Sequence, residues 1–206
     1  KDVKLPEERT TSVDTLEADT LAVLSDLNHA SQKGLQTIFD CSVGRSTVNH
    51  PLGGRYQLTP TEASVQKLPV QHGVTHTASV MAQGFNPYLA EWSPYHGAAY
   101  AVIEATARLV AAGANWSKAR FSYQEYFERM DKQAERFGQP VAALLGSIEA
   151  QIQLGLPSIG GKDSMSGTFE ELTVPPTLVA FGVTTADSRK VLSPEFKTAG
   201  ENIYYI

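Results

Sequence analysis

The clearest hydrophobic pattern lies between Pro94 and about Ala112, where apolar side chains cover almost every face of a helix. Ser93 comes directly before a proline, and Gly113 follows the run, so an N-cap and a stop signal bound it. An apolar surface all round a helix is typical of a buried position. We therefore predict a helix over residues 94–112 that lies between layers.

Two more helices are predicted after it. Ser122 and Glu125 have the spacing of a capping box, which indicates a helix from Ser122 to Phe137 with Gly138 after it. A further helix is expected from Pro140 to Gly155, because a proline is favoured in the first turn and the apolar residues fall mostly on one side.

Segments with strand-like composition flank these helices. Residues 74–82, 156–159 and 177–186 are predicted as strands, since they are rich in β-branched and small apolar residues. Residues 39–70 contain glycines, prolines and short β-prone pieces, which indicate strands and turns in no defined order. Near the start, a short helix is expected from Leu16 to about Ser31, closed near Gly34, after a linker or surface arm.

The order of strands, helices and strands predicts an α+β fold with helices packed on one sheet. It lacks the regular alternation of a doubly wound fold. The chain has 206 residues, 42% of them apolar, which is enough for a substantial core and favours one main domain.

The net charge and the cysteine content limit the classes of function that fit this chain. The net charge is −5, and no Lys and Arg residues cluster, which argues against a nucleic-acid surface. Cys41 is the only cysteine, so an internal disulfide is excluded and a reducing compartment fits. No apolar run approaches the ~18–20 residues of a membrane helix, so we predict a cytoplasmic protein without membrane contact.

Both ends of the sequence suggest a piece of a longer protein. The chain starts without Met and stops inside the strand-like residues 203–206. We therefore expect an internal segment.

The glycine-rich run from Ile159 to Gly167 carries the most informative polar groups, and we expect it to be a loop. Glycines let the backbone approach a phosphate, Lys162 can neutralise it, and Asp163 can bind Mg²⁺ through an oxygen. A P-loop is excluded, because Leu156 stands where its first glycine is required and Asp163 where Ser or Thr is required. The alternative is a β turn whose Lys and Asp are only solvated.

Glu104 lies in the middle of the most apolar predicted helix, where an ionised carboxylate needs a partner. Arg108, four residues later, is placed to form an ion pair within the helix. The alternative is a carboxylate that faces a metal or a phosphate at the edge of a cleft.

His72 and His76 have the spacing of a zinc pair on a helix. Their glycine and β-branched neighbours indicate a strand or loop instead, where four residues span ~13 Å. One zinc ion could not bind both rings at that distance, so no zinc site is predicted.

Several motifs resemble the synthetase part of phosphoribosylformylglycinamidine synthases. The run from Gly160 to Phe169, GGKDSMSGTF, is followed by VPPTLV at residues 174–179. Upstream, residues 53–60 read GGRYQLTP and residues 93–97 read SPYHG, in the order expected of the second synthetase half. The likeness covers roughly residues 20–198.

This resemblance implies a fold like the N-terminal domain of aminoimidazole ribonucleotide synthetase, with a mixed or antiparallel sheet covered by helices on one face. Residues 1–35 would be a linker and N-terminal helix, residues 36–189 the N-terminal-type domain, and residues 190–206 the start of a C-terminal-type domain. The family uses glutamine and ATP to convert formylglycinamide ribonucleotide to formylglycinamidine ribonucleotide, glutamate, ADP and phosphate in purine biosynthesis. The segment alone would be an inactive piece of an ATP-dependent ligase.

The resemblance also implies binding residues for ATP or ADP with Mg²⁺. Glu104 matches a metal-binding glutamate, and Asp163 corresponds to an acidic position that contacts Mg²⁺. The residues expected to face nucleotide or phosphate are Gly160, Gly161, Lys162, Ser164, His72 and Arg108. His72 and Arg108 depart from the family, which has an aspartate and an asparagine there, so this nucleotide site is expected to be weakened, with Arg108 pairing Glu104 in place of a metal.

The expected partners are the first synthetase repeat and the glutaminase domain of the same enzyme. A lone domain would expose its sheet and is expected to form a homodimer. One alternative is a scaffold repeat that has lost nucleotide binding. Another is a stand-alone kinase of the same superfamily, which the lack of an Asp-rich strand in the first seventy residues argues against.

Overall fold

The computed structural model describes residues 12–38 and 44–204. The chain falls into two compact units, Lys1–Cys41 and Ser42–Ile206. Cys41 lies outside the described residues.

The first unit contains two short helices, α1 (Leu16–Ser25) and α2 (Lys33–Ile38), and neither has a buried residue. The prediction of one helix to about Ser31 is wrong. Helix α1 ends at Ser25 because Asp26 adopts an extended backbone and its carboxylate accepts hydrogen bonds from Asn28, which form a turn. Gly34 lies inside α2 and does not close the first helix.

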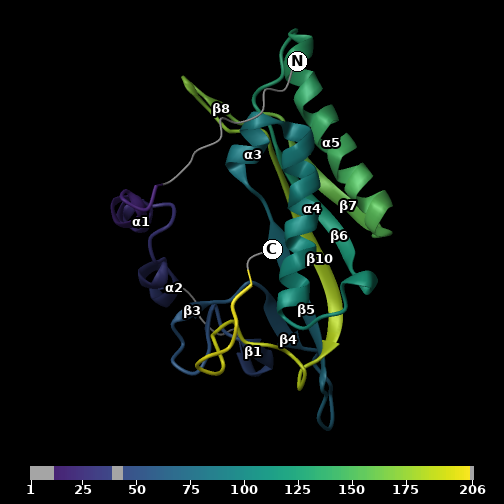
Figure 1. Ribbon diagram of the computed structural model, residues 1–206. Coiled ribbons are helices and arrows are strands. Elements are labelled where there is room, and N and C mark those ends of the chain that lie inside the picture. Colours follow the sequence, from purple (N-terminus) through teal and green to yellow (C-terminus); the bar gives the residue numbers. More distant parts are fainter. Residues whose placement is uncertain (1–11, 39–43, 205–206) are drawn as a thin grey trace. The chain divides into compact units, whose positions relative to one another are not determined.

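The second unit is built on a six-stranded sheet with the order β1-β4-β5-β10-β6-β7 (Figure 1). Only β6 and β7 pair in parallel, and the other neighbours are antiparallel. The strands of this sheet are β1 (Thr47–Asn49), β4 (Ser64–Lys67), β5 (Thr77–Gly84), β6 (Arg120–Tyr126), β7 (Ser158–Ser164) and β10 (Thr177–Asp187). Two hairpins accompany it, formed by β2 (Leu52–Gly53) with β3 (Thr59–Pro60) and by β8 (Thr168–Phe169) with β9 (Leu172–Thr173). The predicted mixed sheet is confirmed.

Helix α4 (Pro94–Ala111) packs on β5 and β10 at one face of this sheet, α5 (Ala134–Leu154) packs beside α4, and α3 (Pro87–Trp92) precedes them (Figure 1). The predicted bounds of α4 are confirmed, but the prediction that it lies between layers is wrong, because Tyr100, Ile103 and Val110 form an exposed side of the helix. The Ser93 hydroxyl accepts a hydrogen bond from the His96 backbone N–H, and Gly113 follows the helix with φ of +86°. Two single 3₁₀ turns, η1 (Gly44–Ser46) and η2 (Trp116–Lys118), complete the unit.

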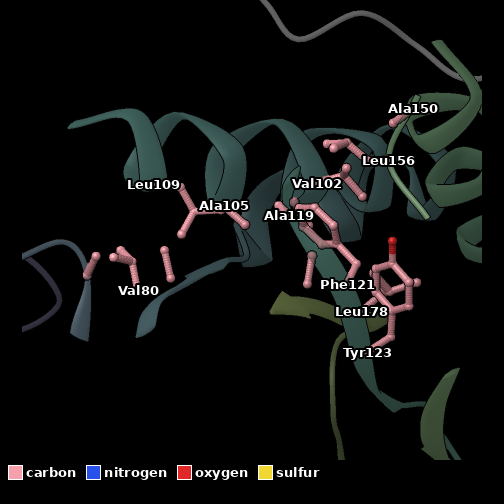
Figure 2. Close-up of a cluster of buried hydrophobic side chains, with 14 of the residues drawn as sticks. Val80, Val102, Ala105, Leu109, Ala119, Phe121, Tyr123, Ala150, Leu156 and Leu178 are labelled. Carbon is pink, nitrogen blue, oxygen red and sulfur yellow. The ribbon is translucent and has the colours of Figure 1, made fainter. Parts of the chain in front are cut away.

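The core lies between α4, α5 and the covered face of the sheet, as the side chains in Figure 2 show. Strand β5 alternates, because Ala78, Val80 and Ala82 are buried while Met81 points to the opposite face and is exposed. The largest fully buried hydrophobic side chains are Phe121, Phe127, Leu109, Val65, Val80 and Val102. The sheet therefore buries one face under helices and leaves the other face open.

Two glycines allow the layers to approach closely. A Cβ atom at Gly84 of β5 would overlap the backbone of α4 at Ala101, and one at Gly146 of α5 would overlap the Tyr95 carbonyl. Larger residues at either position would force α4 away from its neighbours.

The helix predicted over residues 122–137 is wrong. Residues 120–126 form β6, in which Phe121 and Tyr123 alternate into the core between β10 and β7. Sheet pairing on both sides and burial of every second residue outweigh the capping-box spacing. The next helix starts at Ala134 and continues through Pro140, six residues earlier than predicted.

The strands predicted near residues 74–82 and 177–186 are confirmed as β5 and β10. Among the described residues, no helix is both long and apolar enough to span a bilayer.

Candidate functional site

The glycine-rich segment is the edge strand β7 and not a loop, which corrects the prediction. It pairs in parallel with β6, and α5 provides the crossover between the two strands. Gly160 has φ of +143°, beside a register shift between Phe121 and Ser122, so the chain needs glycine there. A Cβ at Gly161 would lie 3.0 Å from the Tyr123 carbonyl oxygen, so this glycine lets β7 lie close to β6.

Lys162 and Ser164 lie on the open side of β7. The Lys162 ammonium is 5.7 Å from the centre of the Tyr126 ring, and no carboxylate pairs with it among the residues that the structure describes. The Ser164 hydroxyl is 3.2 Å from the Ser166 hydroxyl. An exposed cation with neighbouring hydroxyls can bind a phosphate group.

Asp163 and Glu125 face each other across the β6–β7 pair, where they are register partners. Glu125 is only 7% exposed, whereas Asp163 is exposed. Burial raises the pKa of the Glu125 carboxyl, and the nearby charge of Asp163 raises it further. Two carboxyls that share one position favour either a proton or a bound cation between them.

The Tyr123 hydroxyl adds a third polar group on the same side of β6. It is buried and has no hydrogen-bond partner within residues 12–38 and 44–204, and its ring lies beside Leu178 and Phe121 (Figure 2). Burial raises the pKa of this hydroxyl, and Glu125 raises it as well. Tyr123 and Glu125 are not among the predicted site residues, although the period of two in Phe121, Tyr123 and Glu125 is a signal for a strand at this position.

Both carboxylate oxygens of Glu104 have partners within the protein. Its Oε1 is 2.8 Å from Nη2 of Arg108, and its Oε2 accepts a 2.8 Å hydrogen bond from the Phe85 backbone N–H. The predicted ion pair within the helix is therefore confirmed.

Arg108 has two further partners. Its Nε is 2.8 Å from Glu62 Oε2, and its Nη1 donates to the Gln83 carbonyl at 3.0 Å. Glu62 was not singled out from the sequence, because it lies in an irregular segment far from Arg108 along the chain. With a guanidinium against the carboxylate, Glu104 does not fit a Mg²⁺ site in this arrangement.

The remaining predicted site residue, His72, is not brought to Glu104. It lies in the connection that precedes β5, whereas Glu104 contacts Phe85 just after β5 ends. Strand β5 has eight residues, which corresponds to about 26 Å of extended chain. Among the described residues, no three His, Cys, Asp or Glu side chains are placed to share a metal ion.

The predicted site residues therefore fall into two separate groups. Lys162, Asp163 and Ser164 lie on β7, whereas Glu104 and Arg108 lie over β5. Strands β10 and β6 stand between them, so three strand spacings, about 14 Å, separate the groups.

The fold places the chain in a structural class, the α+β domains of the aminoimidazole ribonucleotide synthetase type. Three similar solved structures come from Thermotoga maritima. PurLQS matches with a TM-score of 0.65, 20% identity and 81% of this chain covered. PurL complexed with ADP matches with a TM-score of 0.63, 18% identity and 82% of this chain covered. Phosphoribosylformylglycinamidine synthase II matches with a TM-score of 0.58, 20% identity and 74% of this chain covered.

These matches cover only a part of each similar protein. The chain spans about a quarter of each similar protein, with 25%, 26% and 23% of their lengths covered. No family model matches the sequence, and no curated protein matches it significantly. At this level of identity the likeness shows the fold.

Proposed function

We propose that the chain is a domain of an ATP-dependent ligase of the phosphoribosylformylglycinamidine synthase type and has no complete active site by itself. The shared fold and the GGKDSMSGTF run, whose first five residues lie on the exposed edge strand β7, support this assignment. The reaction of such an enzyme consumes formylglycinamide ribonucleotide, glutamine and ATP. Other domains, including a first synthetase repeat and a glutaminase, would supply the rest of the machinery, since this chain matches only a quarter of the similar proteins.

Within that enzyme, we assign the nucleotide contact to β7. Lys162 would neutralise a phosphate, and Ser164 would donate a hydrogen bond to it. The observation that carries this assignment is that Lys162 and Asp163 are consecutive exposed residues of the edge strand β7, on its two opposite faces, and that neither forms an ion pair with a described residue. Asp163 and Glu125 are the oxygen donors that would hold Mg²⁺, which would supply charge neutralisation to the phosphates.

A scaffold role is the second candidate, and a specific observation favours it. The Arg108 guanidinium forms ion pairs with Glu104 and Glu62. The carboxylate that was predicted to bind a metal on α4 is therefore already neutralised by a side chain of the protein. In the scaffold reading, the domain would support a partner repeat without binding nucleotide at all.

The open face of the sheet is the surface that we propose for the partner repeat, or for a second copy of an isolated chain. Met81, Tyr126 and Val183 are exposed on it. Apolar side chains on an uncovered sheet face favour association with another sheet.

An equilibrium titration with ADP, with and without Mg²⁺, tests the proposal. We expect Mg²⁺-dependent binding that Lys162→Gln weakens by at least tenfold, because a charge-assisted contact to phosphate is lost. Lys132→Gln removes the same charge from an exposed position before α5 and is expected to leave the affinity unchanged.

The result separates the two candidates. Binding that depends on Lys162 supports the nucleotide contact at β7. A folded chain without detectable ADP binding, which forms a dimer by light scattering, contradicts that contact and favours the scaffold role.

A further inference from the structure

A cavity of about 430 Å³ lies between the turn that joins β2 to β3 and the segment around Glu195. Its walls include Arg55, Tyr56, Phe196 and Lys197. Small-molecule sites have volumes of ~300–1,000 Å³, so the cavity is large enough for a ligand. It shares no lining residue with the groups around Lys162 or Glu104.

The turn and the C-terminal segment are held in direct contact. The Gln57 N–H donates to the Gly54 carbonyl at 3.1 Å, so Arg55 and Tyr56 are the two central residues of the turn. A Cβ at Gly54, which has φ of +81°, would lie 2.9 Å from the Glu195 carboxylate. Glycine therefore lets the two walls meet, and the cavity is built into the fold.

The charges around the cavity favour an anion. Lys197 is 2.8 Å from Glu195 and also donates to the Ser193 carbonyl at 2.9 Å, so these two opposite charges neutralise each other. Arg55 forms no ion pair with any residue in the part of the chain that the structure describes. The cavity therefore carries an unbalanced guanidinium in a chain whose net charge is −5.

The aromatic residues indicate what else the ligand carries. Tyr56 is 75% exposed and Phe196 is 84% exposed, although both line the same cavity. The Arg55 guanidinium lies 5.6 Å from the centre of the Tyr56 ring, so the cation and this ring belong to one surface. Stacking against a planar group would remove apolar ring surface from water.

We propose that this cavity binds a small planar anion, an aromatic ring that bears a carboxylate or phosphate group. Arg55 binds the anionic group, because its fork of N–H donors matches carboxylate and phosphate oxygens. Tyr56 and Phe196 hold the ring. A cation is disfavoured, since Lys197 already pairs with Oε1 of Glu195, the one carboxylate among the described lining residues; its Oε2 is buried without a hydrogen-bond partner in the described part of the chain and remains an acceptor.

Phenyl phosphate and benzoate are the probes, and binding is followed by the amide signals of residues 54–58, 193 and 195–197 in the 206-residue chain. We expect a saturable shift with at least one of the two probes, and the preferred probe identifies the anionic group. Inorganic phosphate has the charge without the ring, and benzyl alcohol has the ring without the charge. Each of these controls is expected to bind at least tenfold more weakly than the preferred probe.

Variants connect the binding to the proposed residues. Arg55→Gln is expected to weaken binding at least tenfold, and Tyr56→Leu is expected to weaken it severalfold. Arg129→Gln removes an exposed guanidinium outside the cavity and should leave binding unchanged, as should Lys162→Gln. The proposal is overturned if neither probe saturates, if a control binds as tightly as the preferred probe, or if Arg55→Gln binds like the original chain.

Discussion

Arg108 lies one turn after Glu104 on α4, and its guanidinium bridges Glu104 and Glu62 with two contacts of 2.8 Å each. The two carboxylates come from different parts of the chain, since Glu62 precedes β4. One side chain therefore ties α4 to the segment before β4, at the position where the resemblance implied a metal site.

Loss of this bridge should lower stability. Arg108→Met keeps the aliphatic stem and removes the charge, which leaves Glu104 and Glu62 without a cation. We expect the free energy of unfolding to fall by about 1–2 kcal/mol, because both ion pairs are partly exposed. Urea unfolding measures this change. The exposed Arg45→Met is the matched control, and an equal effect from both substitutions would show that the bridge contributes nothing.

Glu125 should make stability depend on pH. Its pKa is raised in the folded state by burial and by Asp163, so the folded chain binds more protons than the unfolded chain above pH ~4.3. The free energy of unfolding therefore decreases as the pH rises from the unfolded pKa to the folded pKa, by at most about 1.4 kcal/mol per pH unit.

Glu125→Gln should remove this dependence and make the chain more stable than the original at pH 7, with a smaller difference at pH 4. Urea unfolding at a series of pH values measures the slope. The same change at the exposed Glu91 should leave the slope as it is. A Glu125→Gln variant with an unaltered slope would refute the role given to burial.

Two glycines of α5 should respond in opposite ways to the same added methyl group. Gly146→Ala places a Cβ against the Tyr95 carbonyl and should lower the free energy of unfolding by about 1–3 kcal/mol. Gly138→Ala has nothing within 4 Å of its new Cβ and should be stabilising by about 0.5–1 kcal/mol through helix propensity. Thermal unfolding of both variants checks this. Equal effects would mean that α4 and α5 do not pack as closely as described.

The elements predicted correctly from the sequence are those with local signals at both ends. Helix α4 is bounded by Ser93 and Gly113, whose backbone preferences act on their own helix. Strand β6 was predicted as a helix, because the spacing of Ser122 and Glu125 matches a capping box. Its true state depends on pairing with β10 and β7, which lie more than thirty residues away in the sequence.

Only the part of the candidate site that depends on local spacing could be predicted from the sequence. The pair of Glu104 and Arg108 follows from helical spacing and is confirmed. Glu62 joins them only through the fold, and Glu125 meets Asp163 only through strand register. The separation of Lys162 from Glu104 likewise depends on the strand order, which no local pattern contains.

The central claim is that nucleotide binds at β7 and not beside Glu104 and Arg108 of α4. The most direct test is paramagnetic broadening of amide signals by Mn²⁺ with ADP, where Mn²⁺ replaces Mg²⁺. Nucleotide at β7 predicts that signals of residues 123–126 and 160–164 broaden at the lowest Mn²⁺ concentration, before those of residues 102–110. Broadening centred on residues 102–110, with the signals of β7 unaffected, would contradict it.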